Sequence, residues 1–443
     1  MKYYFSPAAI AYGACFATAL MFSPQVFAIQ TFIVNTTLDQ PDTDPNDHVC
    51  QTSVGTCSLR AAIMQANYVT STDVTIVVPA GVYTLTTPSV FHGGDDLSEL
   101  TLATPASGSP AITIVGAGTA TTIIDGNGDN RVFSVGFARA ATIREVTIRN
   151  GSWTWGAGIK NAGTLTLDHV LVSGNANALV GGGIDNSGNL TVRFSSIVGN
   201  TASSGGGVYN RSGGSLTAIA STVASNSADN GGGLFNADGG TMIIVNSTIA
   251  GNHAITSGGG VASDGSGSSG TFYNATIVYN DADHDNNGTG NGGGIFFVGS
   301  GSTLNFSNSL LAGNYVGNTQ PVYSDCDGIG TLVMNGYGFS LIGSSPGTSG
   351  ACTVYGDFGT HDFLNSTDYL GTLQSNGGPT QTVALLSGSN AIDTAGAIQR
   401  CRDQNSQPIQ TDQRGFPRNV GPCDVGAFEY GAIDDVIFRD GFE

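Results

Sequence analysis

Lysine is almost absent from this 443-residue sequence, which contains only Lys2 and Lys160. Lysine and arginine together number 14 against 33 aspartates and glutamates, so the formal net charge is −19. Proteins that bind nucleic acid neutralise its phosphates with clustered basic residues. The scarcity of basic residues therefore argues against a nucleic-acid partner, and a solvated acidic surface is the simplest explanation of the charge.

Long hydrophobic runs are missing after the first 28 residues, so we expect no transmembrane span in the mature chain. The amino-terminal segment has a basic residue at Lys2, an apolar stretch AAIAYGACFATALMF, and small or apolar residues at Val26 and Ala28. This pattern predicts a signal peptide of residues 1–28 that is cleaved after Ala28. The protein is then expected to be exported, either secreted or held at the cell surface.

Cysteine is also scarce. Cys15 lies in the expected signal peptide, which leaves six cysteines in the mature chain. An even number in an exported protein favours disulfides over metal thiolates or a cysteine nucleophile. Six cysteines allow 15 pairings, and their closeness in sequence favours three bridges: Cys50–Cys57, Cys326–Cys352 and Cys401–Cys423.

Glycine, in contrast, is abundant, with 66 residues that recur in clusters. Spacings of 25, 24, 26, 27 and 34 residues separate the starts of six clusters: Gly156, Gly181, Gly205, Gly231, Gly258 and Gly292. A period near 25 residues indicates stacked supersecondary units. Each unit has short segments of alternating apolar residues between glycines and asparagines, which is typical of β-strands. The repeats predict an all-β, right-handed parallel β-helix with about 25 residues and three strands per coil.

Asparagine recurs at two positions of the repeat. Stacked coils place equivalent residues above one another, so each set is expected to form a ladder of amide hydrogen bonds at a corner of the solenoid. The first set is Asn175, Asn200, Asn226, Asn252, Asn280 and Asn314. The second set is Asn161, Asn186, Asn210 and Asn236.

A capping helix is predicted in CSLRAAIMQAN. Ser58 is a favourable N-cap residue, and four apolar residues recur at i, i+3, i+4 and i+7: Leu59, Ala62, Ile63 and Ala66. Their stripe would cover the open end of the first coil. The predicted order begins with a signal peptide (1–28), a cap with the first strands (29–110) and the β-helix repeats (111–345). A disulfide-pinned C-terminal region (346–430) and an acidic tail (431–443) follow.

Motifs at the two ends resemble known families. CSLRAAI, preceded by DQPDTDPNDHVC, resembles the CSLREA-domain proteins, although Ala61 stands where that motif usually has glutamate. LQSNGGPTQTVALLSGSNAIDTAG and TDQRGFPRNVGPCDVGAFEY are similar to the choice-of-anchor Q family, and the closing IDDVIFRDGFE resembles a tail of other exported proteobacterial proteins. The resemblance implies a right-handed β-helix protein of the bacterial surface or exterior, and it implies no substrate.

Parallel β-helices commonly host polysaccharide lyases and hydrolases, so the residues that such enzymes need are relevant to this sequence. A lyase needs a base and a cation beside the uronate, and the lysine-poor repeats offer no concentration of basic residues. A glycoside hydrolase needs two carboxylates roughly 5–10 Å apart. Asp125 and Asp129, with Arg131 nearby, form the best local group. The competing interpretation is an acidic turn in which Arg131 pairs with an aspartate.

Calcium is the one cofactor that the sequence suggests, and it would be structural. Ca²⁺ takes six to eight oxygen ligands, and two acidic clusters could supply them: Asp39, Asp42, Asp44 and Asp47, and Asp281, Asp283 and Asp285 beside His284. The second cluster is no EF-hand, because Asn286 stands where the turn glycine belongs. The six histidines are dispersed, and none has the spacing of a zinc motif.

Two exposed features are relevant to binding. An outward row of Thr222, Thr248 and Thr276 is expected, because the apolar residue after each threonine should point inward. Such a hydroxyl row suits carbohydrate or, if long and regular, ice, although β-propensity alone also explains it. Trp153 and Trp155 could stack on a sugar ring or pack at a coil transition.

The leading hypothesis is an exported, non-catalytic β-helix that acts in surface display, adhesion or glycan contact, with a glycan or a cell-surface protein as its partner. The first alternative is a polysaccharide-active enzyme on the same scaffold, with the catalytic group around Asp125 and Asp129. The second alternative is a structural stalk that has no saturable ligand.

Overall fold

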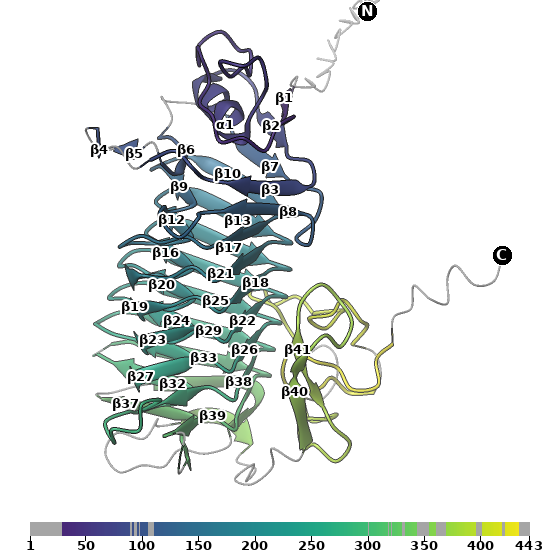
Figure 1. The fold of residues 1–443 in the computed structure, drawn as a ribbon. Helices are drawn as coiled ribbons and strands as arrows, with labels where there is room; N and C mark the ends of the chain where they lie inside the picture. Colours follow the sequence, from purple (N-terminus) through teal and green to yellow (C-terminus); the bar gives the residue numbers. More distant parts are fainter. Residues whose placement is uncertain are drawn as a thin grey trace, which may run out of the picture.

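The computed structural model describes residues 29–88, 91–92, 95–96, 98–104, 110–299, 301–317, 319, 321–329, 333–342, 354–359, 369–395, 401–418 and 421–433. The predicted signal peptide, residues 434–443 and Cys352 lie outside this part of the chain. The described residues form a right-handed parallel β-helix, which confirms the fold expected from the repeats (Figure 1). Among them, no helix has the length and apolar character that a membrane crossing requires.

The largest sheet has 21 strands in two rows, which meet at β38 because this long strand pairs with both rows. The first row consists of β1 (Gln30–Ile33), β2 (Val74–Val77), β7 (Ile112–Val115), β10 (Ala140–Arg144), β13 (Thr164–Asp168), β17 (Asn189–Arg193), β21 (Ser215–Ile219), β25 (Thr241–Val245), β29 (Ser269–Tyr273), β33 (Thr303–Ser307), β38 (Val333–Ile342) and β39 (Val354–Gly359). The second row consists of β3 (Gly81–Thr84), β8 (Thr122–Asp125), β11 (Thr147–Arg149), β14 (Leu171–Ser173), β18 (Ser196–Val198), β22 (Thr222–Ala224), β26 (Thr248–Ala250), β30 (Thr276–Val278) and β34 (Leu310–Ala312).

Two further sheets complete the coils. The nine-stranded sheet consists of β6 (Leu100–Leu102), β9 (Phe133–Val135), β12 (Ile159–Asn161), β16 (Ile184–Asn186), β20 (Val208–Asn210), β24 (Leu234–Asn236), β28 (Val261–Ser263), β32 (Ile295–Val298) and β37 (Cys326–Ile329). The seven-stranded sheet consists of β15 (Ala178–Val180), β19 (Ala202–Ser204), β23 (Ser227–Asn230), β27 (His253–Ser257), β31 (Asp281–Ala282), β35 (Tyr315–Val316) and β36 (Val322–Tyr323). A short hairpin joins β4 (Phe91–His92) to β5 (Asp95–Asp96).

Each middle coil contains four strands, so the expectation of three per coil is wrong. One coil runs through β16, β17, β18 and β19 before the next glycine cluster. The fourth strand has little apolar pattern, since Ala202 is the one buried residue of β19. The coils pack so closely at the glycine cluster that follows that a side chain would not fit. A Cβ on Gly206 would lie 2.4 Å from the carbonyl oxygen of Ser227 in the next coil.

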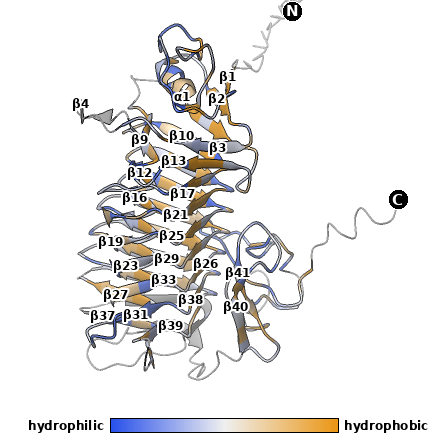
Figure 2. Ribbon diagram, viewed as in Figure 1, coloured by the Kyte–Doolittle hydropathy of each residue, from blue (hydrophilic) through white to orange (hydrophobic). Residues whose placement is uncertain are grey.

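Apolar side chains from successive coils form a continuous core inside the solenoid. On β17, Leu190 and Val192 are buried, whereas Thr191 between them faces outward and is half-buried. The parallel register places Leu190 between Leu165 and Leu216 of the neighbouring coils. Figure 2 shows hydrophobic residues concentrated along these strands. The period-two pattern of the sequence therefore fixes which side chains are buried.

Both asparagine ladders are confirmed. Nδ2 of Asn200 donates to Oδ1 of Asn226 at 3.0 Å, and Nδ2 of Asn226 donates to Oδ1 of Asn252 at 3.0 Å. The ladder ends where Asn314 donates to the carboxylate of Asp325 at 2.7 Å. The same amide contacts join the members of the second ladder: Asn161, Asn186, Asn210 and Asn236.

The predicted capping helix is α1 (Leu59–Tyr68). The hydroxyl of Ser58 accepts a hydrogen bond from the backbone N–H of Ala61 at 3.0 Å, as an N-cap residue does. The apolar stripe is buried against the first coils. The Cys50–Cys57 disulfide ties the preceding loop to the start of this helix.

The C-terminal module (residues 369–395, 401–418 and 421–433) docks beside the solenoid, next to β22 and β26 (Figure 1). It contains the antiparallel strands β40 (Leu370–Gln374) and β41 (Thr382–Leu385). The predicted Cys401–Cys423 disulfide lies inside it. Cys326 is disulfide-bonded as well, and its predicted partner, Cys352, lies outside the described residues. An apolar cluster between module and solenoid includes Ala250, Val278, Leu310, Leu385 and Val425.

The predicted exposed threonine row is wrong, because the C-terminal module covers it. Thr222, Thr248 and Thr276 have relative exposures of 1%, 0% and 2%. The register places a different threonine column on the outer side of the first row of strands, where the side chains are half-buried to exposed: Thr31, Thr75, Thr113, Thr142, Thr166, Thr191 and Thr217.

Candidate functional site

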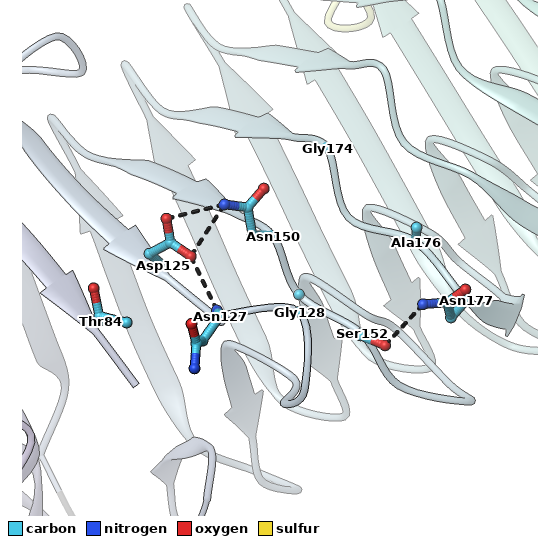
Figure 3. A pocket seen from close by; sticks show the side chains of 10 residues that line it. Thr84, Asp125, Asn127, Gly128, Asn150, Ser152, Gly174, Ala176 and Asn177 are labelled. Atoms are coloured by element: carbon cyan, nitrogen blue, oxygen red, sulfur yellow. Dashed lines mark hydrogen bonds between the residues drawn. The ribbon is translucent and has the colours of Figure 1, made fainter. Parts of the chain in front are cut away.

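The first surface hollow contains Asp125 and has a volume of about 400 Å³ (Figure 3). Asp125 ends β8, and its carboxylate accepts from the N–H of Asn127 at 2.9 Å, Nε of Arg149 at 2.8 Å and Nδ2 of Asn150 at 3.0 Å. Burial alone would raise the pKa of Asp125, but these donors outweigh burial and lower it. The carboxylate is therefore an ionised acceptor that joins neighbouring coils, and it is poorly suited to act as a general acid.

The predicted group of Asp125, Asp129 and Arg131 does not converge. Asp129 is exposed in the turn after β8 and does not line the hollow that contains Asp125. Arg131 extends to a different face, where it forms an ion pair with Glu99. The expectation that Arg131 pairs with an aspartate is therefore wrong, since its partner comes from another coil, just before β6.

A second hollow, which we call the tryptophan groove, lies between β6, β9, β12 and the turn after β11. Its volume is about 510 Å³, and the side chains that matter chemically are Glu99, Arg131, Phe137, Trp153, Trp155 and Lys160. The relative exposure of Phe137 is 73% and that of Trp155 is 49%. Two large aromatic surfaces are thus open to solvent beside charged groups.

Arg131 organises this groove. Its Nε lies 3.1 Å from the carbonyl oxygens of both Trp155 and Gly156, and its guanidinium carbon lies 5.6 Å from the ring centroid of Trp153. The carboxylate of Glu99 neutralises the guanidinium, and both side chains are buried. Arg131 therefore fixes the turn that presents the two tryptophans, with a cation–π contact to one of them.

Lys160 is the single lysine after the predicted signal peptide, and it projects from β12 into the tryptophan groove. The register places it between Ser134 and Asp185. Asp185 is already bound by Arg211 through contacts of 2.6 and 2.8 Å. Within the described part of the chain, the ammonium group of Lys160 has no ion pair or hydrogen bond. It remains available to a ligand.

The same outer face continues along the nine-stranded sheet. Tyr209 and Phe235 stack with ring centroids 5.0 Å apart, and Arg211 lies over Tyr209 at 5.7 Å. A further hollow of about 320 Å³ adjoins them. Sequence reasoning missed this face. The signal was present, because Lys160, Asp185, Tyr209 and Phe235 occupy equivalent positions in successive repeats.

The first predicted calcium cluster holds a loop against the cap. Asp39 binds Arg60 at 2.6 Å and accepts from the backbone N–H groups of Thr86 and Thr87. Burial acts in the opposite direction, yet these contacts lower the pKa of Asp39. Nε2 of Gln65 donates to Asp42 at 3.2 Å and to Asp47 at 3.0 Å. Asp44 accepts from the backbone N–H of Asn46 at 3.2 Å. Nitrogen donors thus already bind at least one carboxylate oxygen of each aspartate.

The second predicted calcium cluster is divided. Asp283 accepts from the N–H of Gly288 at 3.0 Å, and Asp285 accepts from Nδ2 of Asn287 at 2.8 Å. Asp281 faces two imidazoles instead. In the part of the chain that the structure describes, the one group of three metal-ligand side chains is His253, Asp281 and His284. Calcium at either acidic cluster stays a prediction without an assembled ligand set.

Comparisons with known proteins identify no family. No protein-family model matches the chain, and no curated protein matches it in sequence. Similar solved structures include the crystal structure of pectate lyase Pel9A, with 15% identity and a TM-score of 0.47 over 91% of this chain and 97% of that chain. ORF18 of Geobacillus virus E2 has 14% identity and a TM-score of 0.27 over 63% of this chain and 59% of that chain. Likenesses this distant carry no argument about function.

Proposed function

We propose that this chain is an exported β-helix protein that binds a glycan in the tryptophan groove without cleaving it. The observation that carries the proposal is the juxtaposition of two solvent-exposed aromatic rings with the ammonium group of Lys160. Surface display or adhesion is the biological role that we propose with it, because the groove lies beside the amino-terminal cap, at one end of a long solenoid.

The chemistry of the groove suits a sugar ring. A pyranose has apolar C–H faces and hydroxyl edges, so it can lie on an aromatic face while its edges form hydrogen bonds. Trp155 and Phe137 offer open faces, whereas Trp153 lies beneath the Arg131 guanidinium. Lys160 supplies three N–H donors to hydroxyl or carboxylate oxygens. The groove would thus favour a glycan with an anionic substituent near the stacked ring.

Two observations favour binding over hydrolysis. Glu99, the carboxylate of the groove, neutralises the buried Arg131. Asp125 lies in a different hollow with a lowered pKa. A glycoside hydrolase needs a pair of carboxyl groups, one of which stays protonated near neutral pH.

A second candidate function is elimination from a uronate polymer, and one observation favours it. Lys160 and Arg131 line the same groove, and β-elimination needs a base for the α-proton and a cation beside the uronate carboxylate. The ion pair with Glu99 weighs against this candidate, because Arg131 is already neutralised.

The test is binding of the purified protein to a glycan array, followed by an assay of each bound polymer for new chain ends and unsaturated uronate. We expect saturable binding and an intact polymer. Trp155→Ala and Lys160→Met should each weaken binding at least about tenfold, whereas Tyr369→Ala, which removes an exposed aromatic ring of the C-terminal module, should not.

The other outcomes decide between the alternatives. Cleavage that Lys160→Met abolishes would establish the lyase function in place of simple binding. An absence of saturable binding to any glycan would favour the structural stalk. Binding that survives both groove substitutions would place the glycan elsewhere.

We also propose that the protein is exported and belongs with the CSLREA-domain and choice-of-anchor Q proteins. The disulfides fit an oxidising compartment. Motif residues at both ends have connecting roles: Arg60 binds Asp39 and the carbonyl oxygen of Glu99, and Gln413 binds solenoid threonines. These contacts give physical reasons for the motifs and support the assignment.

A further inference from the structure

His253, Asp281 and His284 meet on the seven-stranded sheet, on a different sheet from the tryptophan groove. Nδ1 of His253 contacts Oδ1 of Asp281, and Nδ1 of His284 lies 2.6 Å from Oδ2 of the same carboxylate. The two imidazole centroids are 4.5 Å apart. The three ligand atoms all lie within 4.8 Å of one another. Two imidazole nitrogens and one carboxylate group thus face the same small volume.

The solenoid holds His253 and Asp281 in place. His253 begins β27 and Asp281 begins β31, directly after two asparagines of the first ladder, and the register pairs the two residues. The backbone N–H of His253 donates to Asn226 at 2.9 Å, and that of Asp281 donates to Asn252 at 2.9 Å. The geometry is therefore set by the ladder and not by a flexible surface.

His284 comes from the loop that lengthens this repeat to 34 residues. Its backbone N–H donates to the carbonyl oxygen of Ala254 at 3.1 Å, which ties the loop to the residue after His253. Asp283 closes the loop by accepting from the N–H of Gly288. A Cβ on Gly290 would lie 2.3 Å from the backbone nitrogen of Asp283. The loop is thus folded tightly in the conformation that directs His284 at Asp281.

The charge of Asp281 requires a partner. Its side chain is 0% exposed, whereas His253 and His284 are 34% and 45% exposed. A buried carboxylate is costly unless a positive group or a metal compensates it. Among the residues that the structure describes, no lysine or arginine pairs with Asp281. A protonated imidazole would compensate this charge, and so would a cation held between the carboxylate and the two imidazoles.

We propose that His253, Asp281 and His284 bind one divalent transition-metal ion of the Zn²⁺ class, an inference that goes beyond glycan binding. Imidazole nitrogens suit Zn²⁺, Ni²⁺ and Cu²⁺, whereas Ca²⁺ requires oxygen ligands. Zn–N and Zn–O bonds are about 2.0–2.2 Å, so ligands of one ion lie at most about 4.4 Å apart. Small side-chain rotations complete such a site. The exposed imidazoles leave room for water as a further ligand.

The test uses the full protein without a polyhistidine tag, after treatment with a chelator. Titration with Zn²⁺ is followed by calorimetry and titration with Co²⁺ by its visible absorption. We expect one ion per chain, a cobalt spectrum with nitrogen ligation, a higher melting temperature with Zn²⁺, and no competition from millimolar Ca²⁺. Asp281→Asn, His253→Gln and His284→Gln should each weaken binding by more than the roughly 10- to 100-fold typical of an outer-shell partner.

His169→Gln is the matched control. His169 also contacts a carboxylate through Nδ1, that of Asp168 at 2.8 Å, but Arg193 is the second partner of Asp168. This variant should bind the ion as the wild type does. His284 lies in a surface loop, so its variant tests binding even if Asp281→Asn does not fold. Failure of the wild type to take up one ion would overturn the proposal, and so would wild-type affinity in both histidine variants.

Discussion

The hydroxyl of Thr248 donates a 2.6 Å hydrogen bond to Oε1 of Gln413, although 165 residues separate the two in the sequence. Nε2 of the same glutamine lies 2.9 Å from the hydroxyl of Thr222 and 3.0 Å from that of Thr380. One buried amide therefore connects two coils of the solenoid to the C-terminal module.

Gln413→Ala should detach the module. The substitution leaves several buried polar groups without their partner, at a cost of about 3 kcal/mol. Limited proteolysis should cut after residue 369 sooner than in the wild type, and the melting temperature should fall. Gln410→Ala is the control, because among the described residues the exposed side chain of this glutamine has one hydrogen bond, to the carbonyl oxygen of Pro408. Equal protease resistance of the two variants would contradict the role of Gln413.

The module should be more stable at mildly acidic pH. Burial raises the pKa of Glu429 to about 7 and that of Asp424 to about 6, although Arg418 opposes the shift in both groups. In the unfolded chain these groups titrate near pH 4, so the folded protein binds more protons between about pH 4 and 7. Its free energy of unfolding therefore falls as the pH rises through this window.

Urea unfolding at pH 5 and pH 8 measures this effect. The net charge of −19 acts in the same direction, so Glu429→Gln is needed for comparison. The variant should show a shallower dependence on pH than the wild type. Stability that rises from pH 5 to pH 8 in the wild type would refute the prediction.

Asn226→Ala should destabilise the solenoid from within. The side chain accepts from Asn200 at 3.0 Å and donates to Asn252 at 3.0 Å and to the carbonyl oxygen of Ile197 at 2.9 Å. Removal leaves these buried groups unpaired and should lower the free energy of unfolding by about 3 kcal/mol. Asn189→Ala, at an exposed position of β17, should change it by less than about 0.5 kcal/mol. Urea titrations of the two variants provide the comparison.

Glu99→Gln should disturb the tryptophan groove through Arg131. The substitution leaves the buried guanidinium without its counter-charge, which costs about 3 kcal/mol. Thermal unfolding should shift to lower temperature, and the tryptophan fluorescence should change because Arg131 contacts Trp153. Asp129→Asn, at an exposed position, should leave both signals unchanged. A stable Glu99→Gln variant would show that Glu99 is not needed for charge balance.

The repeating elements were predictable because the same pattern of apolar residues, glycines and asparagines recurs in the sequence of each coil. The positions of Asn200 and Asn226 recur in successive repeats, so their stacking follows from the period alone. The cap was predictable for a local reason, since Ser58 and the apolar stripe that follows define a helix by themselves. In both cases the information lies within one turn or one repeat.

The candidate sites were less predictable because their partners come from different coils. Glu99 and Arg131 are 32 residues apart, and His253 and Asp281 meet only because the register aligns two coils of unequal length. The prediction of an exposed threonine row was wrong for a further reason. Strand alternation does place Thr248 outward, but Gln413, far downstream, covers it.

The docking of the module also implies an order of folding. Contacts such as that between Gln413 and the carbonyl oxygen of Ser221 close a loop of 192 residues, whereas coil-to-coil contacts span one repeat. Loop-closure entropy and the need for a finished docking surface place the module last. A chain that is synthesised amino end first would thus complete its coils, with the apolar flank at Val278 and Leu310 uncovered, before the last segment docks.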